Sequence, residues 1–304
     1  MLTRRQLILG SGAMIASGTG LGGYAYAIEP YRLAIRNYSV RPRRWPRGLN
    51  LRIAAIADLH ACKPWMPIER VLEIVARTNA LGADLIVLLG DYVGSSRVTV
   101  EPVDHGDLAR ALAQLRAPLG VHAILGNHDW WDDDSVQRSF KGTPRLQRAF
   151  ERAGIPVYDN DALRLTKNGH PFWLCGLGDQ WAFYGQRDRK QHPKSAGYLG
   201  RDDLPGTLAK LTDDAPAIMM IHEPDIFADM PDRVALSLAG HTHGGQVQFF
   251  GYAPIIPSRY GHRYLYGQIK EGAKDLIVSG GIGCSGLPIR FGRPPEVVVV
   301  DVEA

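Results

Sequence analysis

The stretch Leu51-Arg52-Ile53-Ala54-Ala55-Ile56-Ala57-Asp58-Leu59-His60 places a short apolar run directly before two residues that can bind a metal ion. A mostly apolar run of this length, closed by a polar loop, is typical of a strand buried on both faces of a sheet. Similar runs recur along the chain. We predict strands over residues 51–57, 85–89, 122–125, 172–175, 217–221, 235–239, 276–279 and 297–302.

Three of the intervening stretches have the periodicity of helices, namely residues 68–81, 106–115 and 145–153. Strands that alternate with helices predict an α/β fold around a central sheet or a pair of sheets. Residues 180–205 are polar and lack a period, which predicts a long loop. Because no linker divides the chain after residue 27, we expect residues 28–304 to form one domain, with its core over residues 50–304.

The composition is that of an ordinary globular protein, with 304 residues, 45% hydrophobic and 22% charged. It excludes a disordered chain, a collagen and a coiled coil. The formal charge of +4 is unevenly distributed, since residues 1–47 hold eight arginines and a single acid, Glu29. The rest of the chain is slightly acidic, so the total charge does not indicate a nucleic-acid partner.

The N-terminal segment is predicted to direct the protein out of the cytoplasm. Arg4 and Arg5 stand before a weakly apolar run that reaches Ala27, and Ala25-Tyr26-Ala27 has the small-x-small pattern of a cleavage site. This segment resembles a twin-arginine signal, which implies the twin-arginine export machinery as a partner. We expect a periplasmic or envelope-associated protein, in which residues 1–27 are either a removed signal or an uncleaved membrane anchor.

The basic stretch that follows, residues 28–47, has two interpretations. Its arginines, interleaved with aromatic residues, could contact the headgroups of an anionic membrane, where each charge is worth about 1 kcal/mol. Alternatively, residues 32–40 form an edge strand whose arginines are solvated on one face.

Polar motifs follow five of the predicted strands in chain order. They are Asp58-x-His60, Gly90-Asp91, Gly126-Asn127-His128-Asp129, His222 and Gly240-His241-x-His243. Ligands of α/β sheets bind beyond the carboxyl ends of strands, so we expect these motifs to converge. Residues two apart point the same way while the backbone is extended, so Asp58 and His60 could address one ion, as could His241 and His243.

These five motifs resemble those of the calcineurin-like metallophosphoesterases, and the resemblance covers residues 50–304. The N-terminal segment, residues 240–246 and residues 289–296 are more narrowly similar to a bacterial envelope branch of that family. That branch includes exported phosphodiesterases and hydrolases of UDP-2,3-diacylglucosamine in lipid A biosynthesis.

The resemblance implies a four-layer αββα sandwich, with two mixed sheets flanked by helices, and a binuclear metal centre. It assigns Asp58, His60 and His243 to the first metal, Asn127, His222 and His241 to the second, and Asp91 to both. Imidazole nitrogens together with carboxylate and amide oxygens do not select one element, so the two divalent ions could be Mn, Fe or Zn.

The resemblance also implies a mechanism of phosphoester hydrolysis. A hydroxide shared by the two metals would attack phosphorus, His128 would protonate the leaving oxygen, and Asp129 would hold the His128 ring. His128 stands where some relatives that cleave activated pyrophosphates carry arginine. This difference favours esters with poor leaving groups.

We therefore expect a metal-dependent phosphoric ester hydrolase that acts on phosphodiesters or phosphomonoesters, which could be lipid-linked, at the cell envelope. One alternative is a pyrophosphatase of a lipid-linked nucleotide sugar, and another is a non-catalytic metal-holding protein that binds in the envelope. Three residues are candidates for contact with substrate: Trp130, Tyr260 and Arg290. Tyr260 lies in a Gly/Pro-rich segment after the metal histidines. As alternatives, Trp130 could pack in the core and Arg290 could form a structural ion pair.

Overall fold

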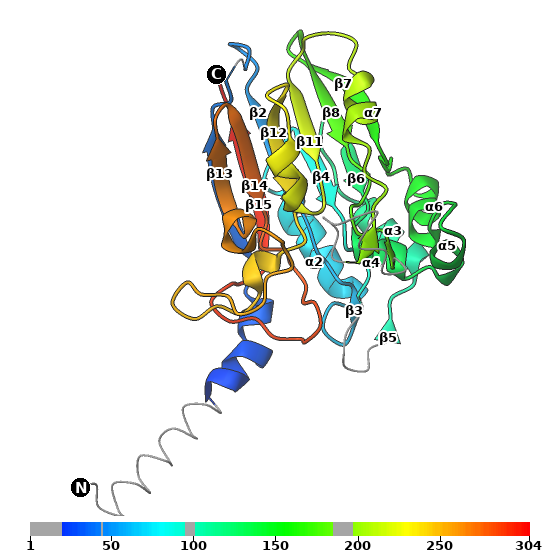
Figure 1. Ribbon diagram of the computed structural model, residues 1–304. Coiled ribbons are helices and arrows are strands. Elements are labelled where there is room, and N and C mark those ends of the chain that lie inside the picture. Colours follow the sequence, from blue (N-terminus) through cyan, green and yellow to red (C-terminus); the bar gives the residue numbers. More distant parts are fainter. Residues whose placement is uncertain (1–19, 44, 95–100, 185–196) are drawn as a thin grey trace, which may run out of the picture.

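The protein, described from a computed structural model over residues 20–43, 45–94, 101–184 and 197–304, contains two large mixed sheets (Figure 1). The first sheet has the order β1 (Ala34–Val40), β15 (Glu296–Val302), β2 (Leu51–Ile56), β4 (Leu85–Leu89) and β6 (Val121–Ile124). The second has the order β13 (Gly267–Glu271), β14 (Lys274–Val278), β12 (Val234–Ala239), β11 (Ala217–Met220), β8 (His170–Gly176) and β7 (Asp161–Lys167).

The two sheets face each other across a continuous apolar core. Alternate residues of β2, such as Ile53 and Ala55, pack in this core with Leu174 and Ile218 of the second sheet. Their neighbours on the same strand point to the opposite face, where Ile56 packs against the helices. Both faces of the central strands are thus buried, which explains why their sequences are uninterrupted apolar runs.

Helices cover the outer face of each sheet, which completes the four αββα layers. The first sheet is covered by α2 (Ile68–Asn79), α3 (His105–Leu112) and α6 (Arg145–Arg152). The layer on the second sheet is thinner and consists of α7 (Leu204–Ala209) with the 3₁₀ turns η2 (Pro224–Asp229) and η4 (Gly261–Tyr264).

The remaining elements are short and lie mainly in loops. They are α4 (Asn127–Trp131), α5 (Asp134–Ser139), β3 (Cys62–Lys63), β5 (Glu101–Pro102), β9 (Phe183–Tyr184), β10 (Tyr198–Leu199), η1 (Glu29–Tyr31) and η3 (His243–Gly245). Residues 20–27 are helical and lie at one end of the molecule, where Figure 1 shows them in dark blue. Within the described residues, no helix is both long enough and apolar enough to cross a membrane.

Each strand and helix expected from the sequence has a counterpart, with ends that differ by a few residues. Strands β7 and β13 were not expected, because both lie at sheet edges and carry polar or charged residues between their apolar ones. The prediction of a loop over residues 180–205 is wrong in part, since β9 pairs with β10 and α7 begins at Leu204. Residues 185–196 of that prediction lie outside the described residues.

The basic stretch forms the edge strand that was one of its two interpretations. β1 pairs in parallel with β15 along its whole length, and nothing pairs with its other side among the described strands. Arg36 lies 3.7 Å from the Glu296 carboxylate, and Arg41 lies 3.4 Å from that of Glu303. Arg36 and Arg41 thus face different acidic groups.

Candidate metal centre

Parallel strands bring the polar motifs together at one edge of the sandwich. β2, β4 and β6 are mutually parallel, and so are β8, β11, β12 and β14, so their carboxyl ends carry the motifs to the same region. All seven proposed ligands are buried, each with at most 6% of its surface exposed: Asp58, His60, Asp91, Asn127, His222, His241 and His243.

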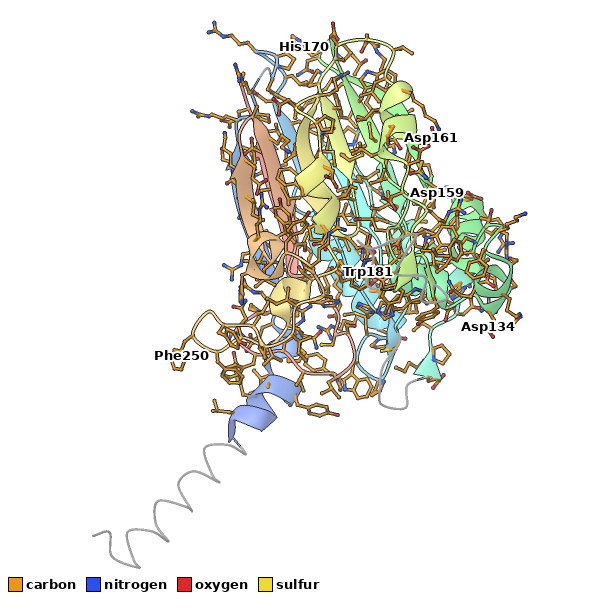
Figure 2. The ribbon with its side chains drawn as sticks, in the orientation of Figure 1. Asp134, Asp159, Asp161, His170, Trp181 and Phe250 are labelled. Atoms are coloured by element: carbon orange, nitrogen blue, oxygen red, sulfur yellow. The ribbon has the colours of Figure 1, made fainter. Side chains whose placement is uncertain are left out.

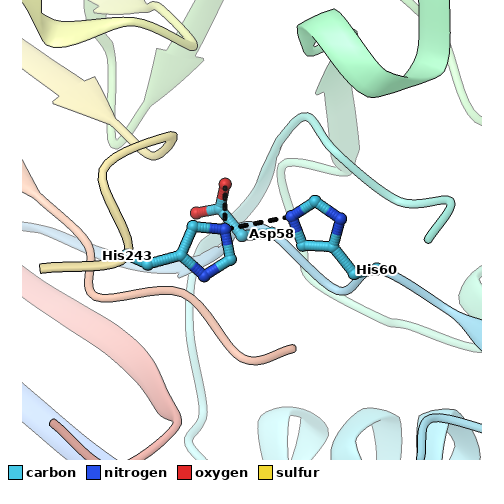
Figure 3. A group of neighbouring side chains, drawn as sticks. All are labelled: Asp58, His60 and His243. Carbon is cyan, nitrogen blue, oxygen red and sulfur yellow. Dashed lines mark hydrogen bonds and ion pairs between the residues drawn. The ribbon is translucent and has the colours of Figure 1, made fainter. Parts of the chain in front are cut away.

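One group of potential ligands consists of Asp58, His60 and His243, whose candidate donor atoms lie within 4.8 Å of one another (Figure 3). His60 Nε2 and His243 Nε2 are 3.0 Å apart, and His243 Nε2 is 3.7 Å from Asp58 Oδ1. This is the set that the sequence assigned to the first metal.

A second group consists of Asp91, His222 and His241, again within 4.8 Å. His222 Nε2 is 3.2 Å from Asp91 Oδ2, and His241 Nδ1 is 3.0 Å from Asn127 Oδ1. Asp91 Oδ2 is also 3.6 Å from His60 Nε2 in the first group. The carboxylate of Asp91 therefore lies between the two groups, where one residue could serve both.

The backbone that presents these residues is not extended. Five of them have a positive φ, which is uncommon for residues other than glycine: Asp58 (54°), His60 (44°), Asp91 (56°), His241 (71°) and His243 (52°). The expectation that Asp58 and His60, or His241 and His243, converge because an extended chain alternates is thus wrong in its reason. The side chains converge through tight left-handed turns, a conformation that is typical of functional sites.

Close backbone packing also shapes the centre. A Cβ atom added to Gly126 would lie 2.4 Å from Asp91 Oδ1 and 2.6 Å from the ring of His222. Only glycine leaves room for these two side chains to approach each other beside the β6–α4 turn.

The chemistry of the side chains fits bound divalent cations. Burial lowers the pKa of His60 and of His241 to about 3, so both rings are neutral and can offer a lone pair. His222 Nδ1 lies 2.7 Å from the carbonyl oxygen of Leu89, a bond that leaves Nε2 directed at Asp91. A histidine that donates its other N–H to a carbonyl is a common arrangement in metal sites.

Two buried ring nitrogens here have no hydrogen-bond partner among the described residues, His60 Nδ1 and His241 Nε2, whereas His222 Nε2 faces the carboxylate of Asp91. Burial works to lower the pKa of His222, but the carboxylate of Asp91 outweighs it and raises that pKa well above its usual value. A metal cation bound between Asp91 and His222 would replace the proton that the His222 ring holds in its absence. The donor set and its unpaired nitrogens therefore fit metal ions.

Comparison with known proteins agrees with this geometry. Residues 51–245, more than half of the chain, match a protein family described as Calcineurin-like phosphoesterase. The chain belongs to this family. It is thereby a phosphoric ester hydrolase whose clustered residues suit a metal site.

Relatives of this phosphoesterase match it over nearly its full length. An uncharacterized metallophosphoesterase of Bacillus subtilis, YkuE, is 30% identical and covers 100% of this chain and 98% of its own. An uncharacterized metallophosphoesterase of Aquifex aeolicus is 29% identical over 93% of this chain and 96% of its own. The phosphodiesterase YaeI of Escherichia coli is 27% identical over 99% of this chain and 100% of its own.

His128 lies at the border of the phosphoesterase's metal centre. Its Nε2 is 4.0 Å from Asp91 Oδ2, its ring packs edge-on against His60 at 4.8 Å, and 13% of its side chain is exposed. It is thus more open to solvent than the buried ligand set.

Asp129 connects two of the loops that carry candidate ligands. Its two carboxylate oxygens accept hydrogen bonds from the backbone N–H groups of Asp91 (2.8 Å), Tyr92 (2.8 Å) and Gly126 (2.9 Å). The residue therefore ties the loop after β4 to the loop after β6. Asp129 thus positions two ligand loops, and its contact with the ring of His128 stays a prediction.

The two neighbouring tryptophans point in different directions. Trp130 is 1% exposed and packs on Phe183, so it belongs to the core and does not line an open site as predicted. Trp131 instead lies 4.9 Å from the ring of His128, and its Nε1 donates to the carbonyl oxygen of Trp181. The reason is helix geometry, because successive residues of α4 are rotated by about 100°.

Four aromatic residues form a wall beside the centre, which we call the aromatic wall: Trp131, Trp181, Tyr184 and Tyr198. The ring of Trp131 stacks on Tyr184 at 4.6 Å and on Tyr198 at 5.2 Å, and Trp181 stacks on Tyr198 at 4.9 Å. Trp181, labelled in Figure 2, meets the ring of His241 edge-on at 4.6 Å.

Arg290 does not reach a substrate, contrary to the sequence-based prediction. The side chain is fully buried, and it donates to the carbonyl oxygens of Gly283 (2.8 Å), Gly280 (2.9 Å) and Arg293 (3.1 Å). Its Nη2 lies 3.2 Å from His243 Nδ1. Arg290 therefore holds the loop over residues 280–293 behind the first ligand group.

Tyr260 lies in the outer layer of the second sheet. It is half-buried, its ring packs on Tyr264 at 5.1 Å, and the guanidinium groups of Arg259 and Arg263 lie over it at 5.2 and 5.6 Å. Its contact with substrate stays a prediction.

Two acidic residues that the sequence analysis did not select also border the centre. The structure holds two further groups of possible ligands, one of His60, Asp91 and His128 and one of Asp179, His222 and Glu223. Asp179 and Glu223 are both buried. Burial raises the pKa of Asp179 well above its usual value, and that of Glu223 as well. Asp179 follows the strand predicted over residues 172–175, so the rule that found Asp91 could have found it too.

Proposed function

We propose that this phosphoesterase hydrolyses phosphodiesters, or phosphomonoesters, at the cell envelope with two divalent metal ions. The observation that supports two ions is the position of Asp91, whose Oδ2 faces His222 on one side and His60 on the other. A carboxylate that serves two cations about 4 Å apart is typical of two-metal hydrolases.

Some residues of the site would hold the cations, and others would transfer protons. Asp58, His60 and His243 would hold one ion, and Asn127, His222 and His241 the other, with Asp91 shared. Divalent cations in such a site stabilise charge on the phosphoryl group and lower the pKa of water.

The chain's own contribution to the reaction is orientation and proton transfer. His128 stands beside the ligand set and would donate a proton to the leaving oxygen of the ester. Asp129 holds the loop that carries Asp91 next to the loop that carries Asn127, because its carboxylate accepts hydrogen bonds from backbone N–H groups of both loops. The aromatic wall would shield the His128 side of the ester from water.

A diester substrate is favoured over a monoester by similarity to the Escherichia coli phosphodiesterase YaeI, which aligns with 99% of this chain. The test is a substrate panel on metal-loaded protein, with bis-p-nitrophenyl phosphate, p-nitrophenyl phosphate and a lipid-linked pyrophosphate, after loading with Mn, Fe or Zn. We expect the diester to be turned over fastest. Preference for the pyrophosphate would replace the proposal with the nucleotide-sugar alternative, and no turnover with any metal would contradict it.

The envelope location rests on the twin arginines, Arg4 and Arg5, which lie outside the described residues. Replacing both by lysine keeps the charge but removes the guanidinium pair that resembles a twin-arginine signal. We expect the native chain in the envelope fraction and the variant in the cytoplasm, with equal diesterase activity after purification. Equal export of both chains would contradict this route.

A further inference from the structure

Exposed apolar side chains are concentrated at one end of the molecule. Among the described residues, eleven large hydrophobic side chains are strongly exposed, and only Phe140 and Tyr184 lie elsewhere. The other nine are Leu21, Tyr26, Ile28, Tyr31, Phe249, Phe250, Tyr252, Ile255 and Leu287. Phe250 has no cover at all and Ile255 is 77% exposed, although burial of either would be favourable in a free globular protein.

These nine residues come from three segments that touch one another, and we call the combined surface the apolar end. The segments are the N-terminal residues 20–31, the loop over residues 246–258 and the loop over residues 284–291. Phe291 joins all three: its ring meets Tyr24 at 6.2 Å and Phe249 at 5.0 Å, and its backbone N–H donates to Gln246. Figure 2 shows Phe250 on the loop at this end of the molecule, at its outer edge in this view.

The N-terminal sequence meets the protein at the apolar end. The backbone carbonyl of Ala25 accepts a hydrogen bond from Arg290 N at 2.9 Å, so residues 20–27 lie against the body of the protein. In the sequence, residues 6–28 contain no charged side chain. The last part of this uncharged run, residues 20–28, is therefore part of the apolar end.

A basic hollow adjoins the apolar end. It has a volume of about 740 Å³, and Arg32, Arg36 and Arg77 line it together with Tyr24 and Phe291. The acidic residue in its lining, Glu29, is 3% exposed, whereas the three arginines are exposed. Apolar side chains next to arginines match the interface of a bilayer, where acyl chains lie beneath anionic headgroups.

We propose that the apolar end docks on an anionic lipid bilayer, with Phe250 and Ile255 inserted among the lipids and the arginines of the basic hollow against the headgroups. Three observations converge on a bilayer: the exposed side chains form one surface, the uncharged N-terminal sequence ends there, and basic residues border it. The proposal does not depend on the identity of the substrate.

Docking in this orientation places the metal centre near the bilayer. The loop over residues 246–258 follows directly from His243 and η3, and the N–H of Gly283 donates to the carbonyl oxygen of Asp58. The two loops that would enter the lipid are therefore continuous in the chain with His243 and with Gly283, which contacts Asp58.

The test measures the depth of a single added tryptophan in the full chain, residues 1–304, reconstituted into vesicles. Phe250→Trp is compared with Phe140→Trp, an exposed position away from the apolar end, and the emission of the parent chain is subtracted from both. Brominated lipids quench only indole groups that enter the acyl region. We expect them to remove most of the added emission of Phe250→Trp and to leave that of Phe140→Trp unchanged.

Two results would overturn the proposal. Equal and weak quenching at both positions would show that the N-terminal sequence tethers the protein while the loops stay in water. Quenching at position 250 that disappears as the protein self-associates would show that a second copy covers the apolar end.

The headgroup contact is tested with the same quenching. With Phe250→Trp, we expect stronger quenching in vesicles that contain phosphatidylglycerol than in phosphatidylcholine alone, and an Arg32→Gln, Arg77→Gln chain should lose this difference. Equal quenching in both lipids would contradict the assignment of the basic hollow to anionic headgroups.

Discussion

At the scale of single residues, His128 is the side chain whose role can be separated from metal binding. It lies 4.0 Å from the shared carboxylate of Asp91 and could form a ligand group with His60 and Asp91, but it is not one of the seven residues assigned to the two metals. A positioned histidine contributes roughly 10²–10⁴-fold to a hydrolysis through proton transfer.

We therefore expect His128→Ala to lower kcat on a diester by roughly 10²–10⁴-fold while the protein keeps its metal content. Steady-state kinetics together with elemental analysis measure both quantities. The matched control is Asp91→Ala, which should lose the ions as well as the activity. Loss of metal from His128→Ala would mean that His128 is a ligand and not a proton donor.

Arg290 is a positioning residue, and its loss should have a different signature. Removing the guanidinium leaves three backbone carbonyl groups without a donor, and a buried unpaired polar group costs about 1–3 kcal/mol. We expect Arg290→Met to lower the free energy of unfolding by several kcal/mol and to weaken metal affinity without raising KM in the molecules that stay loaded. Urea denaturation and metal titration measure these effects.

A surface substitution on the same loop, Leu287→Ser, is the control for Arg290→Met, because its side chain is 48% exposed. It should leave both stability and metal affinity unchanged. If Arg290→Met raised KM alone, with normal stability, the guanidinium would be a substrate contact after all.

At the scale of elements, Asp133 connects two helices next to the centre. Its Oδ1 caps α5 by accepting from Ser135 N at 3.1 Å, and its Oδ2 accepts from Arg145 N at 2.9 Å at the start of α6. Asp133 is 3% exposed. Burial alone would raise the pKa of Asp133, but these hydrogen bonds outweigh it and lower the pKa.

Because the folded pKa of Asp133 is depressed, its contribution to stability is present above the unfolded pKa of about 3.9 and is lost as the pH falls through the folded value. We expect Asp133→Ala to lower the free energy of unfolding by about 1–3 kcal/mol at pH 7. The difference in the free energy of unfolding between Asp133→Ala and the native chain should become smaller below pH 4. Urea denaturation across this pH range measures it, and a gap that does not change with pH would contradict the assignment. Asp134→Ala, at the exposed neighbouring position, is the control.

Elements were predictable from the sequence where burial on both sides leaves an apolar run, as in β2 and β4. The edge strand β7 was not predicted, because it alternates apolar and polar residues. Neither its pairing with β8 nor the exposure of its side chains can be inferred from its own stretch of sequence. The candidate ligands were predictable because each follows a strand. The left-handed turns at Asp58 and His60 were not, because no glycine marks them.

Side-chain direction was the other limit of the sequence. Trp130 and Trp131 are chemically identical neighbours, and only the start of α4 at Asn127 decides which one enters the core. Asp129 is equally ambiguous, since a carboxylate can bind an imidazole or backbone N–H groups. Tertiary contacts decide which tryptophan enters the core and which backbone N–H groups the Asp129 carboxylate binds. These contacts cannot be inferred from the sequence alone.

At the scale of the whole molecule, the metal centre joins the two sheets. Asp58, Asp91 and Asn127 follow strands of the first sheet, whereas His222 and His241 follow strands of the second. Cations bound here would bridge the edge of the sandwich, so their binding free energy would oppose separation of the sheets on unfolding. Without cations, an ion pair between Asp91 and His222 supplies part of this connection.

Metal removal should therefore lower the stability of the entire fold and not only the activity. Saturating one site at 100 times its Kd adds about 2.7 kcal/mol to the free energy of unfolding, and the ions should raise Tm in a concentration-dependent way. Calorimetry of chelated and Mn- or Zn-loaded protein measures the change. Asp91→Ala is the control, because it removes the residue shared by both groups and should show a much smaller rise. Equal Tm values for the chelated and the loaded native protein would mean that the buried carboxylates and imidazoles hold the two sheets together without metal.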